Sequence, residues 1–302
     1  MKLVSILKLI FFGNYFYGLC AVALSIEATL QQQYELQNVT YYIVVFALTT
    51  WYYTKAYITE RMRFTANQRT NWYIENKMFV KRSQAVMLIS SVVMIFTFLH
   101  YHLQDFFALT IQQWIMILIF PITAALYYGV NHKSFGQYNI RSIGWLKPFI
   151  VGFTWAGITT VYPVLYYKLI YHVEGSLTSI DWFLFIKNFM FVTVLCIMFD
   201  IKDYAADYNH DLKTFVVKNG LRKTIFYIII PLSIAGLGSF LMFAIARDFS
   251  LMKMLLNTIP FVLMILLAYS LQKRKSILYY LGLVDGLMLV KAVCGTIAML
   301  YF

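Results

Sequence analysis

Long apolar stretches of about 20 residues alternate along this chain with shorter polar connections. A stretch of this length can cross a bilayer as a helix. Nine such stretches are predicted, over residues 8–28, 39–56, 84–102, 108–130, 148–170, 181–199, 224–245, 251–271 and 278–300. The first is interpreted as a retained span and not a signal peptide, because it is long and lacks a small-residue cleavage site. The pattern predicts an all-α, polytopic integral membrane protein with nine transmembrane helices in a single domain, 1–302.

The composition agrees with a membrane protein and excludes two other classes. Hydrophobic residues make up 61% of the chain and charged residues 13%, and the mean hydropathy is +0.68. Soluble domains contain about 45–50% apolar and about 25% charged residues, and disordered chains are less apolar still. The three cysteines lie in apolar stretches without metal-ligand spacing, so no zinc site or disulfide framework is indicated. A soluble enzyme and a disordered protein are both excluded.

The charges predict how the chain is oriented. The net charge is +12, from 25 Lys and Arg against 13 Asp and Glu. With a cytoplasmic N-terminus, 20 of the 25 basic residues fall in cytoplasmic segments, which is the distribution that sets membrane topology. Topology therefore explains the positive charge, and we expect no nucleic-acid partner. We expect a non-cytoplasmic C-terminus and a lipid bilayer of the bacterial plasma-membrane type.

Two of the predicted cytoplasmic connections are longer and more polar than the others, and we expect function in both. They cover residues 54–83 and 200–223. Long ordered connections in compact proteins often carry function. The first connection is strongly basic and contains only Glu60 and Glu75 as acids, whereas the second contains four of the chain's 13 acids.

The four aspartates of the second connection are regularly spaced. Asp200, Asp203, Asp207 and Asp211 follow at intervals of three, four and four residues, so a continuous helix places them on one face, with Lys202 pointing away. Like charges at these spacings destabilise a helix, and a divalent cation removes the penalty. Ligands that are all oxygen favour Mg²⁺. The alternative is a solvated acidic helix end. The metal site is favoured because carboxylates at the edge of an apolar span are costly unless used.

The residues around these aspartates resemble a known motif. Phe-Asp-Ile-Lys-Asp at 199–203, then Asp207 and Lys213-Thr214, is similar to the second aspartate-rich motif of the UbiA superfamily of membrane prenyltransferases. That motif runs D-x-x-D-x-x-x-D, usually with Lys-Thr shortly downstream. Leu146-Lys147-Pro148 and Trp155, at the start of the fifth predicted span, add to the similarity. Members of the family have nine transmembrane helices, the number predicted here.

The resemblance implies an activity. Members transfer a prenyl group from an isoprenoid diphosphate to a lipophilic, often aromatic, acceptor, with Mg²⁺ bridging the aspartates and the diphosphate. In this chain the resemblance makes Asp200, Asp203 and Asp207 the ligands of Mg²⁺–diphosphate. Asp211 extends the stripe, and Lys202 or an arginine of the first connection contacts phosphate. The expected partners are therefore an isoprenoid diphosphate and a lipophilic acceptor, with Mg²⁺ as cofactor.

The chain departs from the family in the first connection. Members carry their first aspartate-rich motif there, N-x-x-x-D-x-x-x-D. Residues 54–83 contain no aspartate, and Asn71 with Glu75 gives only a short N-x-x-x-E. Arg61, Arg63 and Arg69 can supply the missing charge stabilisation, because guanidinium groups bind phosphate bidentately. The alternative is that these arginines only mark the cytoplasmic side. Fewer metal ions, a different substrate or a loss of catalysis would each account for the departure.

Polar residues inside the predicted spans have two interpretations. Ionisable groups in a membrane usually face the interior of the bundle. We expect Asn14 and Asp285 to line a cavity, and Lys187 and Lys291 to extend toward the interface. Asp285 and Lys291 are six residues apart and do not pair within one helix.

Two functions of other classes remain as alternatives. The first is a catalytically inactive UbiA-like protein that binds lipid or acts as a scaffold. The second is a cation-coupled transporter, which is less favoured because coupling sites usually lie near the membrane midplane and the aspartates begin at a helix end.

Overall fold

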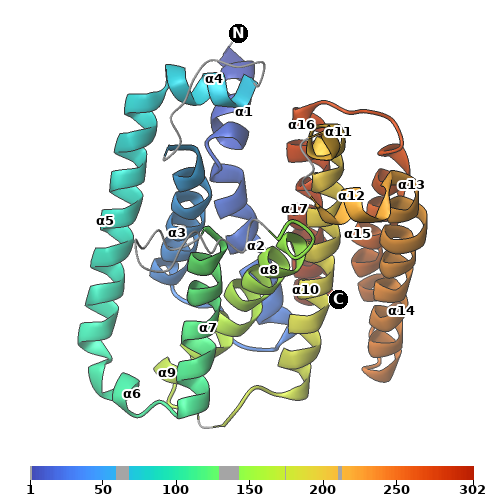
Figure 1. The fold of residues 1–302 in the computed structure, drawn as a ribbon. Helices are drawn as coiled ribbons and strands as arrows, with labels where there is room; N and C mark the ends of the chain where they lie inside the picture. The colour runs from blue at the N-terminus through green and yellow to red at the C-terminus, as the bar shows by residue number, and fades with distance from the viewer. Residues whose placement is uncertain (1, 59–67, 129–142, 174, 210–212) are drawn as a thin grey trace.

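The computed structural model describes residues 2–58, 68–128, 143–173, 175–209 and 213–302, and the regular elements in these ranges are all helices (Figure 1). The first half forms α1 (Lys2–Phe12), α2 (Tyr15–Gln31), α3 (Val39–Ile58), α4 (Gln68–Glu75), α5 (Lys77–Tyr101), α6 (Leu103–Phe107), α7 (Ile111–Tyr128), α8 (Lys147–Ala156), η2 (Gly157–Val161) and α9 (Tyr162–Ile170). The second half forms α10 (Ser179–Asp200), η3 (Ile201–Asp203), α11 (Tyr204–Asn209), α12 (Phe215–Asn219), α13 (Leu221–Lys223), η4 (Thr224–Ile229), α14 (Ile230–Ala246), α15 (Leu251–Ser270), α16 (Ile277–Tyr279), η5 (Tyr280–Val284) and α17 (Gly286–Tyr301).

Six helical segments of the described ranges are long and apolar enough to cross a membrane. They are Lys77–Tyr101, Lys147–Ile170, Ser179–Asp203, Leu221–Ala246, Leu251–Ser270 and Ile277–Tyr301, and the bent pair α1–α2 makes a seventh if it counts as one span. The other two predicted spans coincide with α3 and with α7, which is shorter. The prediction of an all-helical, multi-pass architecture is confirmed, while the number nine stays a prediction.

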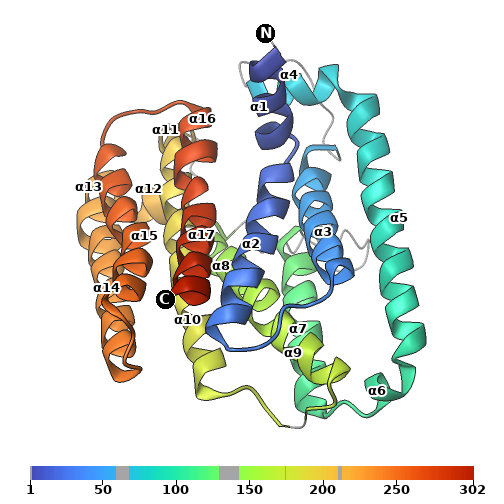
Figure 2. The same cartoon turned by 180° about the vertical axis from the view of Figure 1, so that it is seen from behind.

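The helices pack side by side in a bundle. α10 packs along α8, and α2 packs against both α3 and α17 (Figures 1 and 2). α5 and α14 lie at opposite edges of the bundle, and many of their apolar side chains are exposed. The N-terminus, α4, α11 and α16 lie at one end, and α6 lies at the other. Both long connections predicted to carry function therefore meet the bundle at the same end.

The first predicted span is broken into two helices. α1 and α2 meet at an angle of 63°, with Asn14 between them in the left-handed backbone conformation at φ 64°. Asn14 Nδ2 donates to Thr54 Oγ1 and to the Tyr73 hydroxyl, both at 3.0 Å. Asparagine adopts this conformation more readily than most residues, because its short amide bonds to nearby groups. The single span predicted over residues 8–28 is thus corrected to a bent pair held by α3 and α4.

Three of the long helices contain a π-helical turn, at η2, η4 and η5. Pro163 and Pro231 follow the first two, each as the second residue of the next α-helix. Proline has no N–H to donate, so it frees a carbonyl one turn earlier. In η2 the side chain of Gln32 donates to the carbonyl of Thr160 at 3.1 Å. Irregular turns persist at membrane depth when neighbouring helices bond to their backbone groups, as Gln32 of the segment after α2 does here.

Candidate functional site

Asp200 is the last residue of α10 and the innermost member of the predicted acidic stripe. Its side chain is only 3% exposed, and its Oδ1 lies 2.5 Å from the ammonium of Lys147, the first residue of α8. Its Oδ2 is buried and accepts no hydrogen bond from the residues that the structure describes. A buried acceptor without a donor costs about 1–3 kcal/mol. The Asp200 carboxylate is therefore buried, with one oxygen ion-paired to Lys147 and the other without a hydrogen-bond donor among the described residues.

The helix type changes after Asp200, which corrects the prediction of one continuous α-helix through the aspartates. A 3₁₀ turn, Ile201–Asp203, separates α10 from α11. In a 3₁₀ turn, side chains three residues apart eclipse one another, so Asp200 and Asp203 still share a face, and the position of the full stripe stays a prediction. The prediction that Lys202 points away from the acids is also wrong, because its ammonium lies 3.1 Å from Asp203 Oδ2.

The carboxylates still lie close enough to affect one another. Partial burial, followed by the negative charges of Asp203 and Asp200, raises the pKa of Asp207. Near one another, like charges favour the protonated form of a carboxyl group. Asp200, Asp203 and Asp207 thus form a small acidic cluster at the end of α10, and below we call these three residues the acidic cluster.

The expected metal site is incomplete in the described part of the chain. Within it, no three Asp, Glu, His or Cys side chains come together closely enough to hold a metal ion. Asp211, the fourth predicted ligand, lies outside the described residues. The donor chemistry nevertheless suits Mg²⁺, which takes oxygen ligands and commonly binds one or two carboxylates together with substrate phosphates. The unused Asp200 Oδ2 and the neighbouring Asp203 and Asp207 supply such oxygens.

The predicted phosphate-binding arginines differ in what the structure says of them. Arg61 and Arg63 lie outside the described residues. Arg69 is 4% exposed. Its guanidinium donates to Asn14 Oδ1 and, at 3.4 Å, to the carbonyl of Phe12, and its Cζ lies 4.3 Å from the centre of the Tyr57 ring. These contacts hold the bend between α1 and α2. Arg69 therefore helps to stabilise the bend between α1 and α2.

An aromatic layer lies inside the bundle between α2, α3 and α8. The ring centres of Tyr17 and Tyr53 are 4.6 Å apart and stacked, and Trp155 Nε1 donates to the Tyr53 hydroxyl at 2.6 Å. The Tyr17 hydroxyl donates to Asp285 Oδ2 at 2.6 Å. Asp285 follows η5 directly, and Tyr280 in η5 contacts Phe199, the residue before Asp200, with ring centres 5.8 Å apart. The η5 turn thus connects the end of α10 with this layer.

Asp285 and Asn14 are both buried, as expected for residues that face the bundle interior. The prediction for Lys291 is wrong. Lys291 does not extend to the interface: it is 4% exposed, and its ammonium lies 2.6 Å from Glu27 Oε2 on α2. Gly295 on α17 makes room for this pair, because a Cβ there would come within 2.5 Å of Glu27 Cγ. Gln31 bonds to Glu27 and to Lys187, at 2.7 and 2.6 Å.

Sequence reasoning missed Glu27 and the role of Lys147. A signal existed for Glu27, which is an acid inside an apolar stretch and so requires a partner. Lys147 precedes Pro148 at the start of an apolar stretch; the sequence explains it by topology and by the family similarity, and assigns it no partner. Only the packing of α8 on α10 identifies its partner.

Comparison with protein-family models, with curated proteins and with solved structures gives no match for this chain.

Proposed function

We propose that the acidic cluster binds the Mg²⁺ complex of an isoprenoid diphosphate, and that the protein transfers the prenyl group to a lipophilic acceptor in the membrane. The observation that carries the proposal is Asp200: a buried carboxylate at the membrane edge that is ion-paired through one oxygen and unused through the other. A site of this kind is costly to the apo protein and is relieved by a ligand with positive charge.

The residues around the acidic cluster have complementary roles in this proposal. Lys147 fixes Asp200 in the protein, and it is one-third exposed, so its remaining N–H groups can donate to a diphosphate oxygen. Lys202 stands beside Asp203 and provides a second cation at the same place. Bound Mg²⁺ supplies charge neutralisation for the diphosphate as it leaves.

The aromatic layer suits the prenyl group. When the bond between the prenyl carbon and the diphosphate oxygen breaks, the oxygen keeps the electron pair and the prenyl carbon becomes cationic. Tyr17, Tyr53 and Trp155 present aromatic rings inside the bundle, and such rings attract a cation in a site without water. The acceptor carbon then forms the new bond and loses a proton.

A second candidate function is favoured by the surroundings of Arg69. Near the end of α3, where the family places its other aspartates, Thr54 of α3 and Arg69 and Tyr73 of α4 bond to the bend. A chain with only one acidic cluster can retain the ligand without completing the transfer. The second candidate is therefore a protein that binds prenyl lipids without turnover.

One experiment distinguishes prenyl transfer, prenyl-lipid binding without turnover, and the absence of both functions. The full chain in lipid nanodiscs is titrated with farnesyl and geranylgeranyl diphosphate, with and without Mg²⁺, and release of inorganic diphosphate is followed after quinone and phenol acceptors are added. Asp203→Asn should abolish binding. The matched control is Asp248→Asn, an exposed aspartate in the turn after α14. Binding with release supports transfer, and binding without release supports the second candidate. If neither diphosphate binds, both are wrong.

A further inference from the structure

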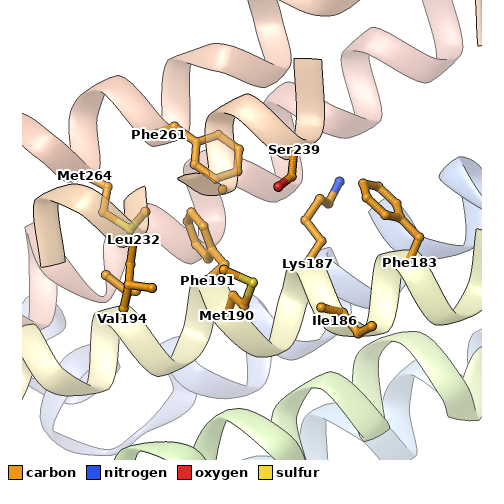
Figure 3. Close-up of a pocket in the computed structure, with 11 residues that line it drawn as sticks. Phe183, Ile186, Lys187, Met190, Phe191, Val194, Leu232, Ser239, Phe261 and Met264 are labelled. Carbon is orange, nitrogen blue, oxygen red and sulfur yellow. The ribbon is translucent and has the colours of Figure 1, made fainter. Parts of the chain in front are cut away.

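A pocket of about 110 Å³ lies between α10, α14 and α15, separate from the acidic cluster. Figure 3 shows Lys187 reaching from α10 toward Ser239 beside Phe183, with Val194, Leu232 and Met264 at the other end. The α10 residues that line it, from positions 183 to 194, are centred roughly 110° around the helix from Asp200 and lie about 9 to 25 Å along its axis. The pocket therefore lies on a different face of α10 from Asp200.

The pocket opens on the outer surface of the bundle. Ile186 and Leu232, at its rim, are 51% and 37% exposed, and Ser239 is also exposed. The helical segments that carry these residues, Ser179–Asp203 and Leu221–Ala246, are both long and apolar enough to cross a membrane. This surface therefore faces lipid tails. A ligand can accordingly enter sideways from the bilayer, with its apolar part against Val194 and Met264.

Lys187 brings into the pocket an amine that no carboxylate of the described residues neutralises. Its ammonium donates to Gln31 Oε1 at 2.6 Å, and no other acceptor bonds to it among the residues that the structure describes. An ammonium has three donors, so two remain. Behind it, Lys291 and Glu27 neutralise each other. With Lys187 protonated, the network formed by these three residues carries one excess positive charge inside the membrane, where ionisable groups normally pair.

We propose that this pocket binds a long-chain carboxylic acid, with its carboxylate on Lys187 and Ser239 and its chain along the apolar wall. A single negative charge matches the single excess cation. The depth also favours a carboxylate, because Lys187 lies eight residues, or about 12 Å, from the start of α10. A carboxylic acid can travel to this depth uncharged, whereas the phosphate group of a phospholipid stays ionised and is held at the interface.

The test measures the binding of stearate and methyl stearate to the full chain in phosphatidylcholine nanodiscs. We expect one saturable site per chain, with stearate bound at least ~10-fold more tightly than the ester, since one charge-assisted contact contributes about 1.5–3 kcal/mol. Lys187→Met should remove the difference, and Lys187→Arg should keep it. The control Lys223→Met, at an exposed lysine outside the pocket, should change nothing.

A second variant keeps the test decisive if Lys187→Met does not fold. Ser239→Phe fills the pocket from an exposed position on α14, and it should abolish stearate binding without disturbing the Glu27–Lys291 pair. Equal affinity for stearate and its ester, or unchanged stearate binding in Ser239→Phe, would overturn the proposal. Displacement of stearate by phosphatidic acid at lower concentration would assign the site to a phospholipid headgroup and would also overturn it.

Discussion

Replacing Lys291 with methionine removes the cation of a buried ion pair and leaves the carboxylate of Glu27 in place. That carboxylate is 1% exposed, and after the substitution its described hydrogen bond comes from Gln31 Nε2, at 2.7 Å. Removal of one partner of a buried pair costs about 3–5 kcal/mol, chiefly because the other charge stays buried. We expect Lys291→Met to lower the free energy of unfolding by this amount, because among the described residues Lys187 is joined to Glu27 only through Gln31, and the close approach of Gly295 leaves Glu27 little room to move.

The assay is reversible unfolding in mixed micelles with increasing SDS, followed by tryptophan fluorescence. The double variant Glu27→Gln/Lys291→Met should recover more than half of the loss, because neither position then carries a charge. Lys273→Met, at an exposed lysine, is the matched control. If Lys291→Met stays within ~1 kcal/mol of the wild type, or if the two single losses simply add, the reasoning about the buried pair is refuted.

Three further predictions use the same unfolding assay. Arg69→Met should lower the free energy of unfolding by at least ~1.5 kcal/mol, because its guanidinium bonds to the bend between α1 and α2; an unchanged value would contradict that role. Gly157→Ala should cost about 1–3 kcal/mol, since the added carbon meets the ring of Phe120 at 2.1 Å, whereas Gly238→Ala, with open space around it, should cost less than half as much. Burial and neighbouring carboxylates raise the pKa of Asp207, so the folded protein holds this proton to higher pH than the unfolded chain, and stability should fall as pH rises from about 4 through the folded pKa. Asp207→Asn should flatten that fall, and an identical pH profile would count against the acidic cluster.

The helices were predictable because apolar length alone determines where a chain can cross a bilayer. The breaks in them were not, because the bend at Asn14 depends on donors and acceptors from α3 and α4. The 3₁₀ turn after Asp200 was likewise not predicted. Hydropathy carries no information on such contacts, which form only when distant helices pack.

The residues of the candidate site were only partly predictable. The spacing of the aspartates identified the acidic cluster, but its cationic partner Lys147 lies 53 residues away from Asp200 in the chain. Glu27 and Lys291 are separated by 264 residues. Partners at such separations follow from which helices are neighbours, and one sequence does not specify that.

The most direct test of the proposed function is calorimetric titration of the full chain with farnesyl diphosphate in the presence of Mg²⁺ or EDTA, for the wild type and Asp200→Asn. Binding should require Mg²⁺ and should weaken at least ~10-fold in the variant, since a charged ligand contact contributes about 1.5–3 kcal/mol. Binding of equal strength in EDTA, or in Asp200→Asn, would contradict the assignment of the acidic cluster as the diphosphate site.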